Sequence, residues 1–245
     1  MPNLPSMYKI KDALQKPFKI IDPDFSSSKQ LLEKYISYRT IGQPLLTELL
    51  KFIPKDALQL CGRKMGIVKG KTILLSNEDE LIVLYNYCLF HYYIREKNAI
   101  DRYMTANRDP LVGNKKIVAL AMKNADFAIL FIEKTLQHGG VIVADLLRGG
   151  KRELLIDKGF SQSTKPGLLL ASTILRYPEF ITTTGTALPL NKISNEIGLL
   201  LEEHAAKYEK FDSLPKAQQS KFITNLLKIC FREEVSEYVR YQDIL

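Results

Sequence analysis

The sequence has few of the residues from which disulfide frameworks and metal sites are built. Its 245 residues include three cysteines, at positions 61, 88 and 230, and three histidines, at positions 91, 138 and 204. The cysteines are far apart and odd in number, which favours neither a disulfide framework nor a CxxC metal site. No histidine has a cysteine or carboxylate at ligand spacing, so we expect no metal and no cofactor. Unpaired cysteines fit a reducing, cytoplasmic environment.

A long apolar run is also missing. The longest, LIVLYNYCLFHYYI at residues 81–94, has 14 residues, whereas a membrane-spanning helix needs about 20. It predicts a buried helix in the core and no membrane span, with His91 as a hydrogen-bonded core residue. The first twenty residues have no apolar stretch after their positive charges, so we expect no secretory signal.

A complete P-loop is absent too, although Gly70, Lys71 and Thr72 form the triplet with which such a loop ends. The motif requires a glycine five residues before Gly70, and that position is Met65. It also requires a strand before the triplet and a helix after it, whereas the flanking residues here favour the reverse. The stretch predicts a β-hairpin with glycine in the left-handed conformation.

What the sequence does have is positive charge, placed unevenly. The net charge is +8. Residues 1–75 hold 13 Lys or Arg against 6 Asp or Glu, and residues 76–245 hold 22 against 21. Such asymmetry attracts an anionic partner, although solvated lysine-rich faces that cluster by chance explain it as well. The candidate anion-binding and nucleic-acid-binding residues are Arg39, Lys51, Lys55, Arg63, Lys64, Lys69 and Lys71.

The order of the patterns predicts an α+β fold in which helices dominate. We expect an irregular arm over 1–28 and one globular domain over 29–245. Within the domain, helices occupy about 29–138, a small antiparallel sheet about 141–190, and further helices about 191–243. The sheet is thus expected as an insertion between two helical regions that surround a central buried helix.

Local signals set finer boundaries. Gly42 predicts the end of a first helix, and Pro44 the first turn of a second. Ser76 with Asp79 predicts a capped start for the central helix, which is expected to continue to about residue 107. Gly149 and Gly150 predict a hairpin loop.

Chemistry-bearing residues concentrate around that hairpin. If the two glycines form the loop, Asp145 lies diagonally across from Arg152, within reach of an ion pair. The candidates for catalysis on an anionic substrate are Asp145, Arg148, Arg152, Asp157 and Ser161. Carboxylates here would act as a base and arginines as an anion clamp. A structural interpretation of the same residues, as cross-strand pairs and helix caps, is simpler.

Three functional hypotheses follow. The first is a non-enzymatic protein that binds another macromolecule through its basic first third. The second is a nucleic-acid contact through the same surface, which requires that affinity fall as salt rises. The third is an enzyme acting at the hairpin, which requires the five side chains to converge on one pocket.

Overall fold

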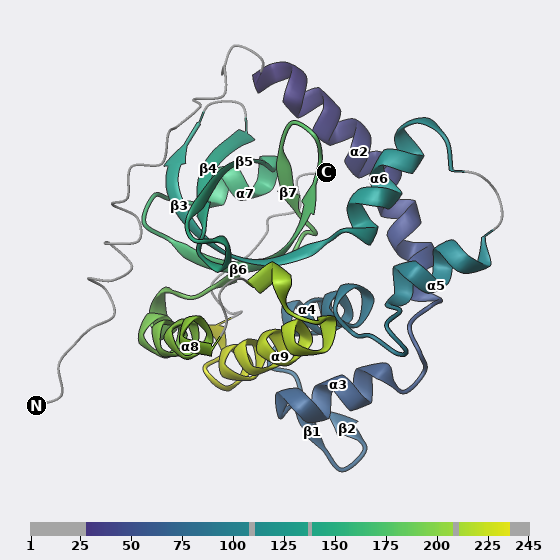
Figure 1. The fold of residues 1–245 in the computed structure, drawn as a ribbon, viewed down its shortest axis with the longest axis vertical. Coiled ribbons are helices and arrows are strands. Elements are labelled where there is room, and N and C mark those ends of the chain that lie inside the picture. Colours follow the sequence, from purple (N-terminus) through teal and green to yellow (C-terminus); the bar gives the residue numbers. More distant parts are fainter. Residues whose placement is uncertain (1–27, 108–110, 137–138, 208–210, 236–245) are drawn as a thin grey trace, which may run out of the picture.

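A computed structural model describes residues 28–107, 111–136, 139–207 and 211–235 (Figure 1). The expected N-terminal arm falls, apart from Ser28, outside the described residues. The helices are α2 (Ser28–Leu50), α3 (Ala57–Met65), α4 (Glu78–Phe90), α5 (Ala99–Ala106), α6 (Gly113–Lys123), α7 (Lys158–Ser163), α8 (Ser194–Lys207) and α9 (Lys216–Arg232). The strands are β1 (Val68–Lys69), β2 (Thr72–Ile73), β3 (Asp126–Thr135), β4 (Gly140–Asp145), β5 (Lys151–Ile156), β6 (Leu169–Arg176), β7 (Ile181–Thr183) and β8 (Leu188–Pro189). Short 3-10 turns are η3 (Leu146–Arg148), η4 (Asn191–Ile193) and η5 (Phe211–Ser213).

Five of the strands close into a barrel. β3 pairs with β4, β4 with β5, β5 with β7, and β7 with β6, and β6 returns to β3. Only the β5–β7 pair is parallel. Helix α7 lies in the connection from β5 to β6, and β8 extends the sheet beside β6. A closed five-stranded Greek-key barrel with this strand order has the connectivity of the OB-fold.

Alternate side chains of the barrel strands enter different cores, as the pleat of a strand dictates. In β3, Ala128, Leu130 and Ile132 pack inside the barrel with residues of the other strands. The neighbouring Phe127 and Ile129 belong to a second core outside the barrel. Because helices cover much of the outside, long stretches of β3 and β6 are buried on both faces.

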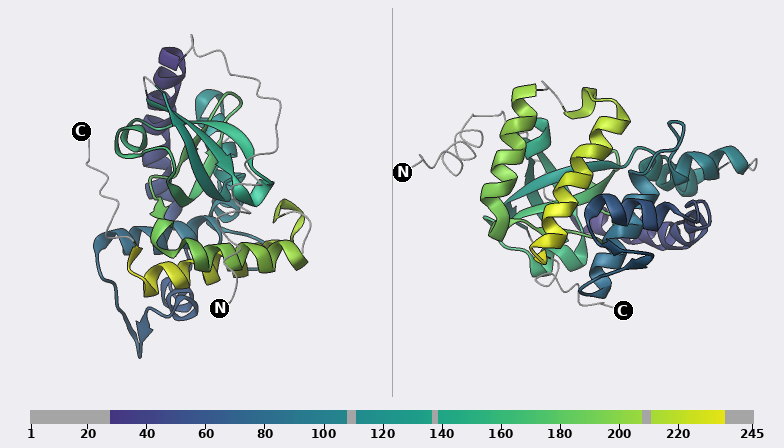
Figure 2. Two further views of the ribbon diagram at one scale, coloured as in Figure 1. Left: turned by 90° about the vertical axis from the view of Figure 1, so that its left-hand side faces the viewer. Right: turned by 90° about the horizontal axis from the view of Figure 1, so that it is seen from below.

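Two groups of helices cover the barrel (Figures 1 and 2). Helices α3, α4, α8 and α9 share one apolar core with the outward side chains of β3 and β6. Helices α2, α5 and α6 form the other core with outward residues of β5 and β6. Helix α4 contributes to both, through Leu84 and Tyr87 on one side and Phe90 on the other.

The expected fold class is therefore wrong: the sheet has six strands, five of which form a closed barrel, and it is no small insertion. The largest error is β3, which occupies residues for which the sequence predicts helix. Its run DFAILFIEKT is buried on both faces over most of its length, so the alternation typical of a half-exposed strand is absent. A continuous apolar run of this kind does not distinguish a strand from a buried helix.

Helix α2 is one helix where the sequence predicts two. Gly42 lies inside it, at a close approach to α6, because a Cβ there would be 3.3 Å from Met122 Cε. Pro44 also lies within the helix. The packing of α2 against α6 thus overrides two local breaking signals.

Helix α4 begins one residue later and ends much earlier than expected. Its cap is Asn77, whose side chain accepts a hydrogen bond from the Glu80 backbone at 3.1 Å. The helix ends at Phe90, and the chain then reverses through Arg95 and Glu96, both with positive φ. A new capping box at Asn98 starts α5, so residues 78–106 form two helices.

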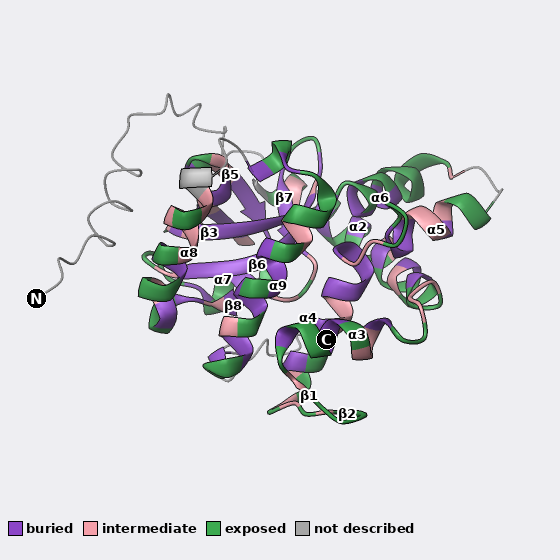
Figure 3. Ribbon diagram, turned by 60° about the horizontal axis from the view of Figure 1, so that its bottom comes forward, coloured by how far each residue is buried: buried purple, intermediate pink, exposed green. Residues whose placement is uncertain are grey.

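The hairpin expected around Gly70 is confirmed. β1 and β2 are antiparallel, with Lys69 opposite Thr72, and Gly70 has φ of +63°. Glycine adopts this angle without strain because it has no Cβ, whereas other residues do not. The hairpin projects away from the barrel, with its strands exposed or half-buried (Figures 2 and 3).

Candidate functional site

Most of the cations expected to bind an anion lie on one projecting unit. It consists of Lys55, α3 and the β1–β2 hairpin. Lys228 of α9 lies beside the end of α3, since a Cβ on Gly66 would meet Lys228 Cε at 3.8 Å. The exposed cations of this unit, together with Lys228, form what we call the α3–hairpin surface: Lys55, Arg63, Lys64, Lys69, Lys71 and Lys228.

Within the described residues, none of these six cations has a carboxylate within 4 Å. Asp56 is the one acidic residue in residues 51–75. Arg63 and Lys64 lie in the last turn of α3, where positive charge suits the helix dipole. Lys69 and Lys71 flank the hairpin turn, so the dipole does not account for them.

Two of the predicted anion-binding residues lie apart from this surface. Lys51, at the end of α2, pairs with Glu48 at 2.8 Å. Arg39 lies in the middle of α2, where it lines a pocket against the barrel.

Asp145 and Arg148 belong to a cluster of charged side chains at one end of the barrel. The Asp145 carboxylate, which has no exposed surface, accepts a hydrogen bond from Arg148 Nη1 at 2.6 Å. Arg148 also pairs with Asp212 at 2.6 Å, and Arg176 with Asp126 at 2.8 Å. Burial raises the pKa of Asp145, and the two arginines oppose that rise. The cluster closes the barrel end with paired charges.

The expected ion pair between Asp145 and Arg152 is wrong. Asp145 lies opposite Lys151, and Arg152 lies opposite Ala144. The reason is that residues 146–148 form the turn η3 before the two glycines, which lengthens the loop to five residues and shifts the register. Arg152 pairs with Glu133 of β3 instead, at 2.9 Å.

Asp157 and Ser161 lie on α7, away from the charged cluster. Asp157 caps α7 by accepting a backbone hydrogen bond at 3.0 Å, and it accepts another from Thr183 Oγ1 at 2.9 Å. Ser161 Oγ donates to a backbone carbonyl of the same helix. None of the five catalytic candidates lines any of three cavities in the described part of the chain. We therefore assign them no common catalytic site.

The rarer side chains of metal and redox chemistry are buried in the cores. Cys61, Cys88 and Cys230 are buried and unpaired. His91 Nε2 lies 2.8 Å from Thr173 Oγ1, whereas His138 falls outside the described residues. In the part of the chain that the structure describes, no group of three or more His, Cys, Asp or Glu is arranged to hold a metal. None of its helices combines the length and apolarity needed to cross a membrane.

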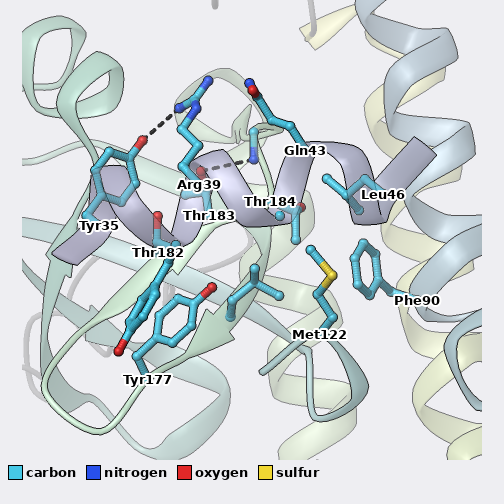
Figure 4. A pocket seen from close by; sticks show the side chains of 14 residues that line it. Tyr35, Arg39, Gln43, Leu46, Phe90, Met122, Tyr177, Thr182, Thr183 and Thr184 are labelled. Atoms are coloured by element: carbon cyan, nitrogen blue, oxygen red, sulfur yellow. Dashed lines mark hydrogen bonds between the residues drawn. The ribbon is translucent and has the colours of Figure 1, made fainter. Parts of the chain in front are cut away.

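The site that sequence reasoning missed is a pocket between α2 and β7, with a volume of about 180 Å³ (Figure 4). One end is apolar, formed by Leu46, Phe90 and Met122. The other end carries the tyrosines and arginine of α2 and the threonines of β7. A mostly apolar cavity with a few convergent polar groups is the usual form of a ligand site.

Two hydroxyls at the polar end have no hydrogen-bond partner within the described residues. Thr182 is 6% exposed, and its Oγ1 is buried without a partner, a state that costs about 1–3 kcal/mol. Tyr177 stacks on Tyr38, with ring centroids 4.6 Å apart, and its hydroxyl points into the pocket (Figure 4). Burial raises the pKa of Tyr177, so this hydroxyl remains protonated and able to donate.

Several other polar groups around the pocket are paired. Tyr35 Oη accepts a hydrogen bond from Arg39 Nη1 at 2.7 Å. Thr183 donates to Asp157, and Thr184 accepts from Asn86 Nδ2 at 2.6 Å. Thr182 thus differs from its neighbours in sequence, although all three threonines fit the strand that the sequence predicts here. Nothing local in TTT distinguishes the unpaired hydroxyl, because the partners of Thr183 and Thr184 are the distant residues Asp157 and Asn86.

Comparison with known proteins places the chain in a family, but the function of that family is unknown. The model of a family of unknown function, DUF7986, matches residues 29–226. No curated protein matches the chain, and no solved structure does.

Proposed function

The chain belongs to DUF7986, a family of unknown function, and we propose from its own surface that it is a non-enzymatic nucleic-acid-binding protein. In this proposal the α3–hairpin surface holds the phosphate backbone of a single strand. The sequence predicts a protein that binds another macromolecule through its basic first third. The proposal specifies that this macromolecule is a polyanion.

The observation that carries the proposal is the set of six exposed cations without carboxylate partners. Elsewhere on the chain, Lys34, Lys123 and Lys151 each pair with an acidic side chain. Lys115 and Lys116 of α6 are also exposed without such a partner among the described residues, but the α3–hairpin surface gathers six cations of this kind. On the α3–hairpin surface the charge remains available to a partner. Lysines and arginines that neutralise phosphates release condensed counterions, which drives binding.

The barrel supports the proposal by analogy alone, because a fold does not determine a function. OB barrels bind oligonucleotides on the face of their second and third strands, which are β4 and β5 here. That face is partly covered: Leu31 and Leu32 of α2 pack in the same core as Leu154 and Ile156 of β5. The projecting hairpin therefore offers the more accessible contact.

The test is the affinity for a fluorescently labelled single-stranded oligonucleotide, measured by anisotropy over a range of salt concentrations. Replacing both hairpin lysines, Lys69→Gln with Lys71→Gln, should weaken binding about tenfold and lower the salt slope by about 1.4, or about 0.7 for each phosphate contact to a single strand. The hairpin is expected to remain folded, because both side chains are exposed.

The matched control is Lys115→Gln with Lys116→Gln, which removes the same charge from exposed positions on α6. This variant should bind within about twofold of the unmodified chain, since distant charges are screened at physiological salt. An equal loss of affinity in both variants would show that the oligonucleotide is attracted by the net charge of the protein and does not bind at the α3–hairpin surface. Affinity that does not fall with salt, or binding of acidic proteins without oligonucleotides, would contradict the proposal.

A further inference from the structure

We propose that the pocket between α2 and β7 binds one nucleobase, with the attached phosphate outside on Arg39. The base arrives either on a free nucleotide or as one unpaired residue of a strand. The second source rests on the proposed function, whereas the first does not. The argument proceeds from the size of the pocket, the chemistry of its walls and the charge at its mouth.

Size limits the occupant to a single ring system. The pocket has a volume of about 180 Å³, and an apolar cavity of about 150 Å³ accommodates benzene. A purine or pyrimidine ring fits this space, but a sugar and phosphate would not fit beside it. Any larger part of the ligand must therefore lie outside the pocket.

The walls select a ring with polar edges. Leu46, Phe90 and Met122 form an apolar end that suits a flat ring face. At the other end the Thr182 hydroxyl is buried without a partner, and the Tyr177 hydroxyl, which points into the pocket, makes no hydrogen bond within the described residues. Hydroxyls both donate and accept hydrogen bonds, so they match the mixed donors and acceptors on the edge of a nucleobase. A hydrocarbon ring would leave both hydroxyls unsatisfied.

The charges place the anionic part of the ligand at the mouth. The buried Asp157 carboxylate accepts a hydrogen bond from Thr183, which lines the pocket. Burial raises the pKa of Tyr35, and the charge of Asp157 adds to that rise. Asp157 does not line the pocket, but a negative group bound deep beside Thr183 would lie near its charge and be repelled. Arg39 and Gln43, by contrast, are exposed on α2 beside the opening (Figure 4). A neutral ring inside and a phosphate against the guanidinium satisfy both constraints.

The test compares nucleotides with nucleosides by isothermal titration calorimetry, using adenosine and uridine and their 5′-monophosphates. The phosphate should improve affinity about tenfold, which corresponds to about 1.4 kcal/mol. Arg39→Gln should remove this advantage and leave nucleoside affinity unchanged. Tyr177→Phe should weaken nucleoside and nucleotide alike by about fivefold, because it deletes a hydrogen bond to the ring.

Thr182→Val separates a binding role from a structural one. Loss of the unpaired hydroxyl should raise the melting temperature of the ligand-free protein by about 2 °C and weaken nucleoside binding about fivefold. Tyr85→Phe on α4, outside the pocket, is the matched control and should change neither. A Thr182→Val protein that is less stable, with unchanged binding, would overturn the assignment of this hydroxyl and the site with it.

Short single-stranded oligonucleotides distinguish the two sources. If the base belongs to a strand, Tyr177→Phe weakens oligonucleotide binding as well; if it belongs to a free nucleotide, only nucleotide binding changes. Both outcomes support the pocket. The Lys69→Gln, Lys71→Gln protein should bind mononucleotides normally, so failure of the hairpin proposal leaves the pocket testable. No binding of any nucleotide at millimolar concentration, or equal effects of Arg39→Gln on nucleotide and nucleoside, would overturn the inference.

Discussion

His91 shows at the scale of one residue how burial turns a titratable group into a structural one. Its side chain is 5% exposed and sits at the end of α4, beside Thr173 of β6. Burial, with a smaller contribution from the positive charge of Lys216, lowers the pKa of His91 to about 3. The sequence predicts this core role, and the hydrogen bond to a strand 82 residues away supplies its partner.

The depressed pKa of His91 makes stability depend on pH. In the unfolded chain the histidine titrates near its ordinary value of about 6.5, so between pH 6.5 and 3 the unfolded state binds more protons than the folded state. Stability therefore rises with pH in this window and is lost as pH falls. We expect the free energy of unfolding to be about 1 kcal/mol lower at pH 5.5 than at pH 7 on account of this group.

Urea unfolding at the two pH values measures the effect. His91→Gln should reduce the difference between pH 7 and pH 5.5, while His204→Gln, on a less buried ring, should retain most of it. An unchanged difference in the His91 variant would contradict the assignment.

Among the elements, those with strong local signals were predictable. The β1–β2 hairpin follows from Gly70, because the turn needs a residue with positive φ and glycine adopts that conformation without strain. Strands around residues 141–156 follow from two strand-like runs, VIVAD and KRELLI, on either side of two glycines. The register there was not predictable, because the turn η3 over Leu146–Arg148 has no distinctive sequence signal.

The elements that the sequence hides depend on distant contacts. β3 is a strand because β6, some 40 residues later, pairs along it and closes the barrel. The pocket is hidden for the same reason: Tyr38 of α2 stacks on Tyr177 across 139 positions of sequence. No window of neighbouring residues contains such a contact, so the hairpin cations were predictable and the pocket was not.

The charged cluster at the barrel end gives a prediction at this scale. Arg148→Met removes the principal partner of the fully buried Asp145 and should lower the free energy of unfolding by about 3 kcal/mol. The loss arises from the carboxylate left in a dry site. Asp212→Asn alters the exposed partner of the same arginine, with 57% of its side chain accessible, and should cost less than about 1 kcal/mol.

Thermal or urea unfolding of the two variants at neutral pH provides the comparison. Equal destabilisation of the two variants would mean that Arg148 does not offset the cost of burying the charge of Asp145. A further variant, Asp145→Asn in the Arg148→Met background, should recover part of the loss, because the buried charge is then gone.

For the whole molecule, the shared cores predict one cooperative unfolding transition. Leu155 lies inside the barrel and Leu226 of α9 in the core between the helices and the barrel, both fully buried. Because the outer face of the barrel and α9 share that second core, either Leu→Ala substitution should lower stability by about 2–5 kcal/mol and shift one transition. The unfolding transition followed by far-UV circular dichroism, which reports the helices, should then coincide in urea with the transition followed by the near-UV signal of the tyrosines.

Leu74→Ala, at a hairpin side chain that is 53% exposed, is the control and should change stability by less than about 0.5 kcal/mol. If Leu226→Ala melts the helices while the tyrosine signal persists, the barrel and the C-terminal helices are separate folding units, and the pocket and the α3–hairpin surface would have to be treated as sites of independently stable parts.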